Sequence, residues 1–225
     1  MSALPPAPIA AVIKAVVFDY GGVISHPPNR SGWGDLAAAA RLPVERLIDA
    51  YLRSREPYDL GLVRGDGYWQ MFGDACGECY STAERQRLIE LDMRMWETID
   101  QAIVAMARQL QRAGFVTGIL SNMHADLLDR IRQNPPWLSA FDVSVFSCDL
   151  GIIKPDARIY RSLLDRLQLA PADVLFIDDY PGNIEAARAA GLHGILFTSS
   201  EQLRADLAGD PFGISLVQDD RNSLL

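Results

Sequence analysis

The chain has 225 residues, of which 49% are hydrophobic and 22% charged, a composition that can bury the core of one globular unit and that excludes disordered and low-complexity classes. Lysine and arginine number 21 against 29 aspartate and glutamate residues, which gives a net charge of −8. A nucleic-acid backbone or an anionic membrane surface would therefore repel the chain overall, whereas a small phosphorylated ligand is compatible with this charge.

The N-terminal stretch is apolar but unlike a secretory signal, because it lacks a basic start, carries three prolines and contains Lys14. No uninterrupted apolar run approaches the roughly 20 residues that span a bilayer. The three cysteines are too few for a disulfide framework and favour a reducing compartment. We therefore expect a soluble, cytoplasmic protein without a nucleic-acid or membrane partner.

Residues 12–18 (VIKAVVF) form the first predicted strand, since β-branched and aromatic residues run without polar alternation into Asp19, Tyr20, Gly21 and Gly22. This pattern is typical of a central parallel strand that ends in a tight turn.

Residues 26–98 hold helical patterns but no convincing strand, which predicts a helical insertion after the first strand. Ser81 and Glu84 form a capping box at the start of one of its helices. Cys76 and Cys79 make a single CxxC motif; we interpret them as ordinary partly buried helix cysteines, with a zinc or redox site as the alternative. The expected core of the insertion consists of Trp69, Met71, Phe72, Leu88, Leu91 and Met95.

From residue 99 onward, strand and helix patterns alternate. A helical repeat of apolar residues begins at Ile99, and similar repeats begin at Ile159, after Pro155, and at Ile184. The predicted strands between them are 115–120, 143–146, 174–177 and 194–197. This alternation predicts an α/β fold, a Rossmann-like doubly wound parallel sheet with an inserted helical domain. The predicted division is residues 1–25 and 99–225 for the α/β core, and residues 26–98 for the helical domain.

Polar residues stand at the carboxyl ends of the predicted strands, where open parallel sheets bind their ligands. They are Asp19, Ser121, Asn122, Lys154, Asp178 and Asp179. Converging carboxylates would repel one another unless a divalent cation were bound, and hard oxygen ligands suit Mg²⁺. Aspartates also cap turns, which is the alternative for each of them taken singly, but capping requires neither the lysine nor the serine.

These residues together resemble the haloacid dehalogenase superfamily, specifically its phosphatase branch with a helical cap after the first strand (subfamily I). The resemblance covers nearly the whole chain. Its four motifs stand here as VVFDYGGVI, ILSN, GIIKPDARIY and FIDDYPGNIEAARAAG.

The resemblance implies an Mg²⁺-dependent phosphatase that hydrolyses a small phosphate monoester, for example a sugar phosphate, through an aspartyl-phosphate on Asp19. By family analogy, Asp19, the backbone carbonyl of Gly21 and Asp179 would bind the metal directly, and Asp178 through water or a hydrogen bond.

The resemblance also implies how a substrate is held. Ser121 and Lys154 would act with Asp19 in catalysis, and Ser121, Asn122 and Lys154 would bind the transferring phosphoryl group.

Gly21 departs from the family's phosphatases, which usually carry an acid/base aspartate two residues after the nucleophile. Loss of such a group typically costs ~10²–10⁴-fold in rate, most for a poor alkoxide leaving group. Sugar-1-phosphate phosphatases with an FDLGN-type first motif share the glycine, and His26 is a candidate substitute acid. One alternative function is a non-catalytic protein that binds a phosphorylated ligand or partner, and another is a 2-haloacid dehalogenase.

Substrate choice is expected to reside in the helical insertion. The candidates that could contact a substrate are Trp33, Arg53, Arg55, Arg64, Tyr68 and Trp69, with the alternative that Trp69 belongs to the core of the insertion and the arginines to its solvated surface.

Overall fold

The structure is a computed structural model that describes residues 12–133 and 135–216. Most of the N-terminal stretch considered above, residues 1–11, lies outside the described residues. Within the described part of the chain, no helix is long and apolar enough to cross a membrane.

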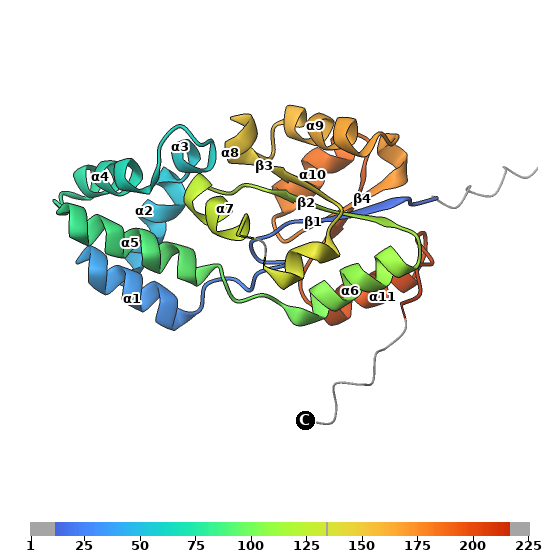
Figure 1. The fold of residues 1–225 in the computed structure, drawn as a ribbon, viewed down its shortest axis with the longest axis horizontal. Coiled ribbons are helices and arrows are strands. Elements are labelled where there is room, and N and C mark those ends of the chain that lie inside the picture. The colour runs from blue at the N-terminus through green and yellow to red at the C-terminus, as the bar shows by residue number, and fades with distance from the viewer. Residues whose placement is uncertain (1–11, 134, 217–225) are drawn as a thin grey trace, which may run out of the picture.

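A five-stranded parallel sheet forms the centre of the molecule (Figure 1). Its strands are β1 (Ala15–Phe18), β2 (Val116–Ser121), β3 (Val143–Phe146), β4 (Val174–Asp178) and β5 (His193–Leu196). They lie in the order β3-β2-β1-β4-β5, and all four neighbouring pairs are parallel. The predicted doubly wound sheet is therefore confirmed, with strand ends displaced by up to three residues from the predicted ones.

Helices cover both faces of the sheet (Figure 1). Alternate residues of β1 divide between two apolar clusters: Val16 and Phe18 face α6 (Gln101–Arg112), α7 (Ala125–Ile131) and α11 (Ser200–Ala208). Ala15 and Val17 face α9 (Ala157–Leu167) and α10 (Pro181–Ala189). The shorter elements are α8 (Ser147–Leu150) and 3-10 turns at Pro136–Ala140 and Pro171–Asp173. The sequence patterns identified neither α7, α8 nor α11.

Five helices follow β1 at one end of the sheet, as expected for residues 26–98. They are α1 (Arg30–Ala40), α2 (Val44–Ser54), α3 (Glu56–Asp59), α4 (Gly65–Cys76) and α5 (Thr82–Met95). The predicted capping box of Ser81 and Glu84 is present at the start of α5.

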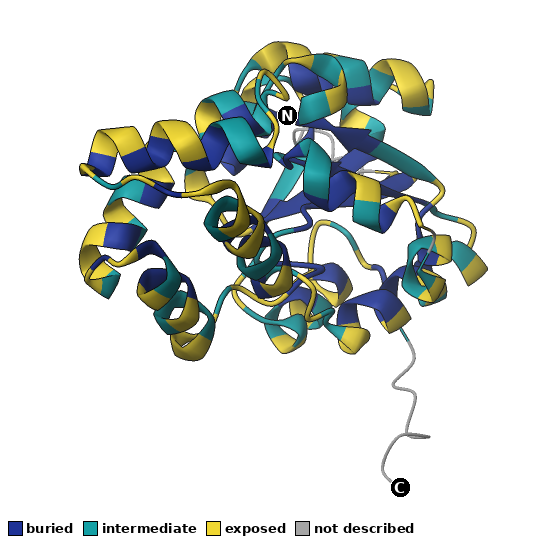
Figure 2. Cartoon of the chain, turned by 60° about the vertical axis from the view of Figure 1, so that its left-hand side comes forward, coloured by how far each residue is buried: buried dark blue, intermediate teal, exposed yellow. Residues whose placement is uncertain are grey.

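The buried positions of the helical insertion, coloured dark blue in Figure 2, belong to the same apolar cluster as one face of the sheet. Trp69, Phe72 and Leu88 are buried there, as predicted. Met71 was wrongly assigned to this core: its side chain is 50% exposed, because a helix turns about 100° per residue and the inward face of α4 is taken by its neighbours.

Candidate active site

The polar residues predicted to share one edge of the sheet do lie at its carboxyl end. Asp19 directly follows β1, Asp178 ends β4, and these two strands are neighbours. Ser121 ends β2 on the other side of β1. The chain reverses its direction of winding between β1 and β4, which is where open parallel sheets form their ligand crevice.

Lys154 joins the two acidic strand ends from the loop between α8 and α9. Its Nζ lies 2.9 Å from Asp19 Oδ1 and 2.7 Å from Asp178 Oδ2. All three side chains are buried. Asp179 is more exposed, and one carboxylate oxygen each from Asp19, Asp178 and Asp179 lie within 4.8 Å of one another.

Burial and mutual repulsion set the electrostatics of this cluster. Burial raises the pKa of Asp19 to about 7, the charges of Asp178 and Asp179 add to this rise, and Lys154 opposes it. The pKa of Asp179 is also raised, by burial and by the charge of Asp178. Burial alone would lower the pKa of Lys154, but the two carboxylates beside it outweigh burial and raise it. The lysine therefore stays charged, and three carboxylates still share one cation.

This excess of buried negative charge is the property that a divalent cation relieves. The available donors are carboxylate oxygens, without a thiolate or imidazole in the cluster, and such hard donors suit Mg²⁺. Asp19, Asp178 and Asp179 thus fit a magnesium site by their chemistry and spacing.

Asn183, in the first turn of α10, is a site residue that sequence analysis missed. Its Nδ2 lies 3.0 Å from both carboxylate oxygens of Asp178, and the Tyr180 N–H donates to Asp178 Oδ1 at 2.8 Å. Tyr160 in turn holds the start of α10, since its hydroxyl donates to the Asn183 carbonyl at 2.8 Å. Asp178 is therefore fully engaged by donors. The sequence signal that could have found Asn183 is an asparagine that lies five residues after Asp178 and directly before the apolar repeat of the helix.

Asn122 and Lys154 hold each other through reciprocal hydrogen bonds. Asn122 Nδ2 donates to the Lys154 carbonyl at 3.0 Å, and the Lys154 N–H donates to Asn122 Oδ1 at 2.7 Å. Ser121 is buried beside them, and its hydroxyl donates to the Asn122 carbonyl at 3.3 Å. Asn122 thus positions the loop that carries Lys154, and its direct contact with a substrate stays a prediction.

Gly22 lets the turn after β1 pass close to Asp179. Its φ is +80°, and a Cβ at this position would lie 2.2 Å from Asp179 Oδ2. Only glycine satisfies both conditions. Gly22, Asp179 and His26 also line an open cavity of ≈ 750 Å³, with His26 at an exposed position.

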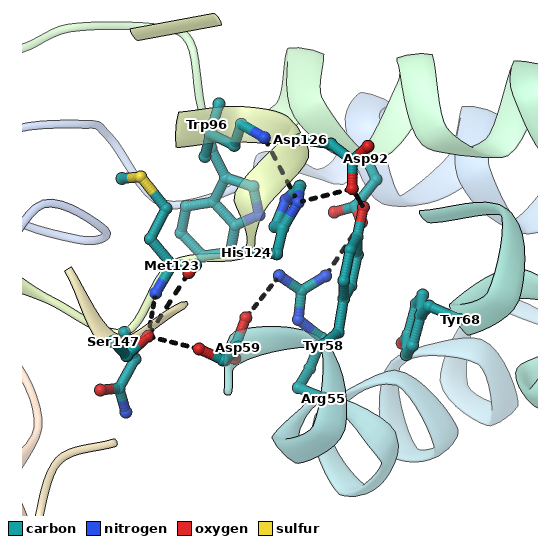
Figure 3. A network of polar contacts seen from close by, with 12 residues as sticks. Arg55, Tyr58, Asp59, Tyr68, Asp92, Trp96, Met123, His124, Asp126 and Ser147 are labelled. Carbon is teal, nitrogen blue, oxygen red and sulfur yellow. Dashed lines mark hydrogen bonds and ion pairs between the residues drawn. The ribbon is translucent and has the colours of Figure 1, made fainter. Parts of the chain in front are cut away.

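Three of the six candidate substrate contacts in the helical insertion lie in its interior. Tyr68 and Trp69 are buried in the core of the insertion. Arg55 does not lie on the solvated surface, which was one of its two expected places: its side chain is only 14% exposed, and its guanidinium donates to Asp92 Oδ2 at 2.9 Å and Asp59 Oδ1 at 3.0 Å (Figure 3).

Asp126, on α7, ties the insertion to the sheet domain (Figure 3). Its Oδ2 accepts a hydrogen bond from the Tyr58 hydroxyl at 3.0 Å and another from the Gly65 N–H at 2.9 Å. Ser147 adds a second connection, since its hydroxyl donates to the Asp59 carbonyl at 2.5 Å. The insertion is therefore held over the carboxyl end of the sheet.

The two cysteines of the CxxC motif differ in environment. Cys76 is buried at the end of α4, whereas Cys79 lies beyond the helix and is exposed, contrary to the expectation of two partly buried helix cysteines. Among the described residues, the cluster of Asp19, Asp178 and Asp179 is the one group of potential metal ligands, so neither cysteine belongs to such a group.

Comparison with known proteins relates the chain to one hydrolase family. A family model described as haloacid dehalogenase-like hydrolase matches residues 13–191. Bifunctional epoxide hydrolase 2 of Mus musculus is 28% identical over 204 residues, which are 82% of this chain and 36% of that protein. Phosphatase MT3486 of Mycobacterium tuberculosis is 26% identical over 213 residues, 92% of this chain and 97% of that protein. The chain spans well under half the length of several curated relatives, between 18% and 40%.

Solved structures share the fold. A HAD family enzyme from Bacteroides thetaiotaomicron in complex with magnesium and inorganic phosphate is similar with a TM-score of 0.68, at 17% identity, over 83% of this chain and 94% of that chain. L-2-haloacid dehalogenase from Xanthobacter autotrophicus gives a TM-score of 0.62 at 20% identity, over 87% of this chain and 82% of that chain.

Proposed function

The chain belongs to the haloacid dehalogenase-like hydrolases, and we propose that within this family it is a magnesium-dependent phosphatase acting on a small phosphate monoester. The observation that carries the proposal is the buried Lys154 held between Asp19 and Asp178, with Asp179 beside them. Phosphatase MT3486, which matches over nearly its whole length, supports the same chemistry. A sugar phosphate is one substrate of this kind.

Mg²⁺ would be held by Asp19, Asp179 and the Gly21 carbonyl, and when bound it would neutralise charge between the nucleophile and the phosphate. Asp178 already accepts hydrogen bonds from Lys154, Asn183 and the Tyr180 N–H, so we assign it to orienting the site. Magnesium in a structural neighbour with the same fold is compatible with this assignment.

The proposed reaction has two steps. An oxygen of Asp19 attacks phosphorus, a P–O bond forms, and the bond to the leaving oxygen breaks with its electron pair. Water then attacks phosphorus, the bond to Asp19 breaks, and phosphate is released. Lys154 and Ser121 hold the phosphoryl oxygens in both steps. The insertion, residues 26–98, acts as the cap that selects the substrate over a core of residues 1–25 and 99–225.

Two alternatives remain distinct from this proposal. A 2-haloacid dehalogenase would also use an aspartate nucleophile, but it needs no metal, and the acidic pair of Asp178 and Asp179 favours the metal-dependent reaction. A protein that only binds a phosphorylated ligand would have no need of a buried nucleophile next to a charged lysine. Gly21 is the main argument for that second alternative.

The test measures phosphate release from a panel of aryl and sugar phosphates with Mg²⁺, with EDTA, and with Asp19→Asn. Turnover that needs both Mg²⁺ and Asp19, with a phosphoryl group found on the Asp19 peptide after acid quenching, is the expected result. Activity retained in Asp19→Asn would contradict the proposal. Chloride release from 2-chloropropionate in EDTA would instead identify a dehalogenase, and binding without turnover would identify a binding protein.

A further inference from the structure

The ring of Trp96 lies against Gly21, the position at which the family's phosphatases usually carry their acid/base aspartate. A Cβ on Gly21 would be 3.1 Å from Trp96 Cζ3 and 3.4 Å from Cε3. Gly21 does not have the positive φ that Gly22 has, so the backbone would admit another residue there. The space beside residue 21 is therefore taken by an aromatic side chain from the end of the helical insertion.

Trp96 is fixed from two sides. Its backbone carbonyl accepts hydrogen bonds from the Tyr20 hydroxyl at 2.7 Å and from Ser25 Oγ at 2.6 Å, both in the turn after β1. Its Nε1 donates to the hydroxyl of Tyr51 on α2 at 3.2 Å. The ring is thus held where it is by the sheet domain and by the insertion together.

The partner of Trp96 is itself part of a buried network. The Tyr51 hydroxyl donates to Asp92 Oδ1 at 2.6 Å. Arg55 pairs with the other oxygen of Asp92, which is fully buried (Figure 3). The Arg55 guanidinium also stacks on the Tyr51 ring at 4.6 Å. Because each member is held by the next, Trp96 cannot leave its position without disturbing the interior of the insertion.

The charged groups around Asp19 leave no spare acid. Within the described chain, the main charges that act on its carboxyl group are those of Lys154, Asp178 and Asp179. Lys154 and Asp178 are paired with each other, and Asp179 belongs to the proposed metal site. The indole of Trp96 has an N–H, which donates to Tyr51, and no group that can supply a proton and take it back.

Resting on the proposed function, we infer that Trp96 takes the place of the acid/base side chain and restricts the enzyme to phosphate esters of acidic hydroxyl groups, phenols above all. The P–O bond breaks with its electron pair on the phenolic oxygen, which leaves as a phenolate and takes its proton from solvent. Trp96 is half-buried with its ring against Gly21, and the face of an indole is a flat apolar surface suited to an aryl group. Alkyl phosphates, whose leaving oxygen needs a proton, react slowly.

The first test is the dependence of kcat/KM on the pKa of the leaving group, measured with Mg²⁺ on a series of substituted phenyl phosphates and on alkyl phosphates. We expect a steep dependence, with alkyl esters at least ~10²-fold slower than aryl esters, as for a reaction without a general acid. A shallow dependence in an active enzyme would overturn this inference alone. Absence of turnover with every ester would overturn the proposed function, and this inference with it.

The second test restores the acid and the room for it. Gly21→Asp alone places a carboxylate against the Trp96 ring, whereas Gly21→Asp with Trp96→Ala gives it space. The double variant should hydrolyse alkyl phosphates at least about tenfold faster than Gly21→Asp alone, with a shallower leaving-group dependence. Equal rates in the two variants would show that Trp96 does not occupy the acid's place.

Two further variants act as controls. Trp96→Phe keeps a ring against Gly21 and should keep the steep dependence of kcat/KM on the leaving-group pKa that wild type shows. Circular dichroism verifies that the variant is folded. His26→Ala tests the histidine that lines the cavity beside Asp179. The dependence of kcat/KM on the leaving-group pKa could be shallow in wild type and become steep in His26→Ala. This result would identify His26 as the acid and overturn the inference. An unchanged steep slope in His26→Ala supports it.

Discussion

Asp19→Asn should stabilise the metal-free protein at neutral pH, although it removes the proposed nucleophile. In the folded chain, burial raises the pKa of Asp19 from 3.8 to about 7, assisted by Asp178 and Asp179 and opposed by Lys154. A carboxylate that must ionise in this environment costs folding free energy. Lys154 keeps its contact with Asp178 at 2.7 Å in the variant, so no charge is left without a partner.

Whether Asp19 raises or lowers the free energy of unfolding at a given pH depends on whether the folded or the unfolded state holds its proton. The folded state retains the Asp19 proton up to about pH 7, whereas the unfolded state loses it near 3.8, so this stabilising contribution is complete below pH 3.8 and is lost as the pH rises through about 7. A shift of about three pKa units at 1.36 kcal/mol each is about 4 kcal/mol, of which about 3 kcal/mol falls between about pH 5 and about pH 8.

Urea unfolding in EDTA, followed by tryptophan fluorescence at about pH 5 and about pH 8, measures this contribution. Wild type should lose about 3 kcal/mol more than Asp19→Asn between the two pH values. Asp165→Asn, at an exposed position on α9, is the matched control and should follow wild type. Added Mg²⁺ should stabilise wild type more than Asp19→Asn. The same pH dependence in wild type and Asp19→Asn would refute the electrostatic argument.

Three further changes test other parts of the structure. Gly22→Ala, whose Cβ would lie 2.2 Å from Asp179 Oδ2, should raise the Mg²⁺ concentration for half-maximal activity by about 10–100-fold in a metal titration. Asp92→Ala removes a buried partner of Arg55 and should lower the free energy of unfolding by about 3 kcal/mol in urea. Burial raises the pKa of Cys148 to about 11, so its alkylation by iodoacetamide, followed by mass spectrometry, should be slow near neutral pH and rise steeply toward that value.

Each of these changes has a matched control in the chain. Gly34→Ala meets nothing within 4 Å and should leave the Mg²⁺ response unchanged. Asp49→Ala removes an exposed partner of Arg53 and should cost less than about 1 kcal/mol. Cys79 is exposed and should be alkylated faster than Cys148. Equal effects in any variant and its control would contradict the corresponding prediction.

Local sequence determined the sheet and much of the candidate site. Each buried parallel strand is a short apolar run, and Asp19, Ser121 and Asp178 stand at the ends of three such runs, so their position along the chain already placed them at one edge. The capping box of Ser81 and Glu84 was equally predictable, because the hydrogen bonds involved lie within four residues.

Short elements and the faces of helices were less predictable. The helices α7 and α8 have seven and four residues, too few for an apolar repeat to stand out. Met71 carries an apolar side chain on the outer face of α4, and only the packing of neighbouring helices decides which face is inward.

Only the tertiary structure decided which side chains meet across the fold. Arg55 buried on Asp92 and Trp96 beside Gly21 each join segments distant in sequence. Charge and size are properties of single residues, and they indicated that a site exists at the strand ends. The proton chemistry that we propose for this site depends on what fills the space next to Gly21, and that space is formed only when the helical insertion packs against the turn after β1.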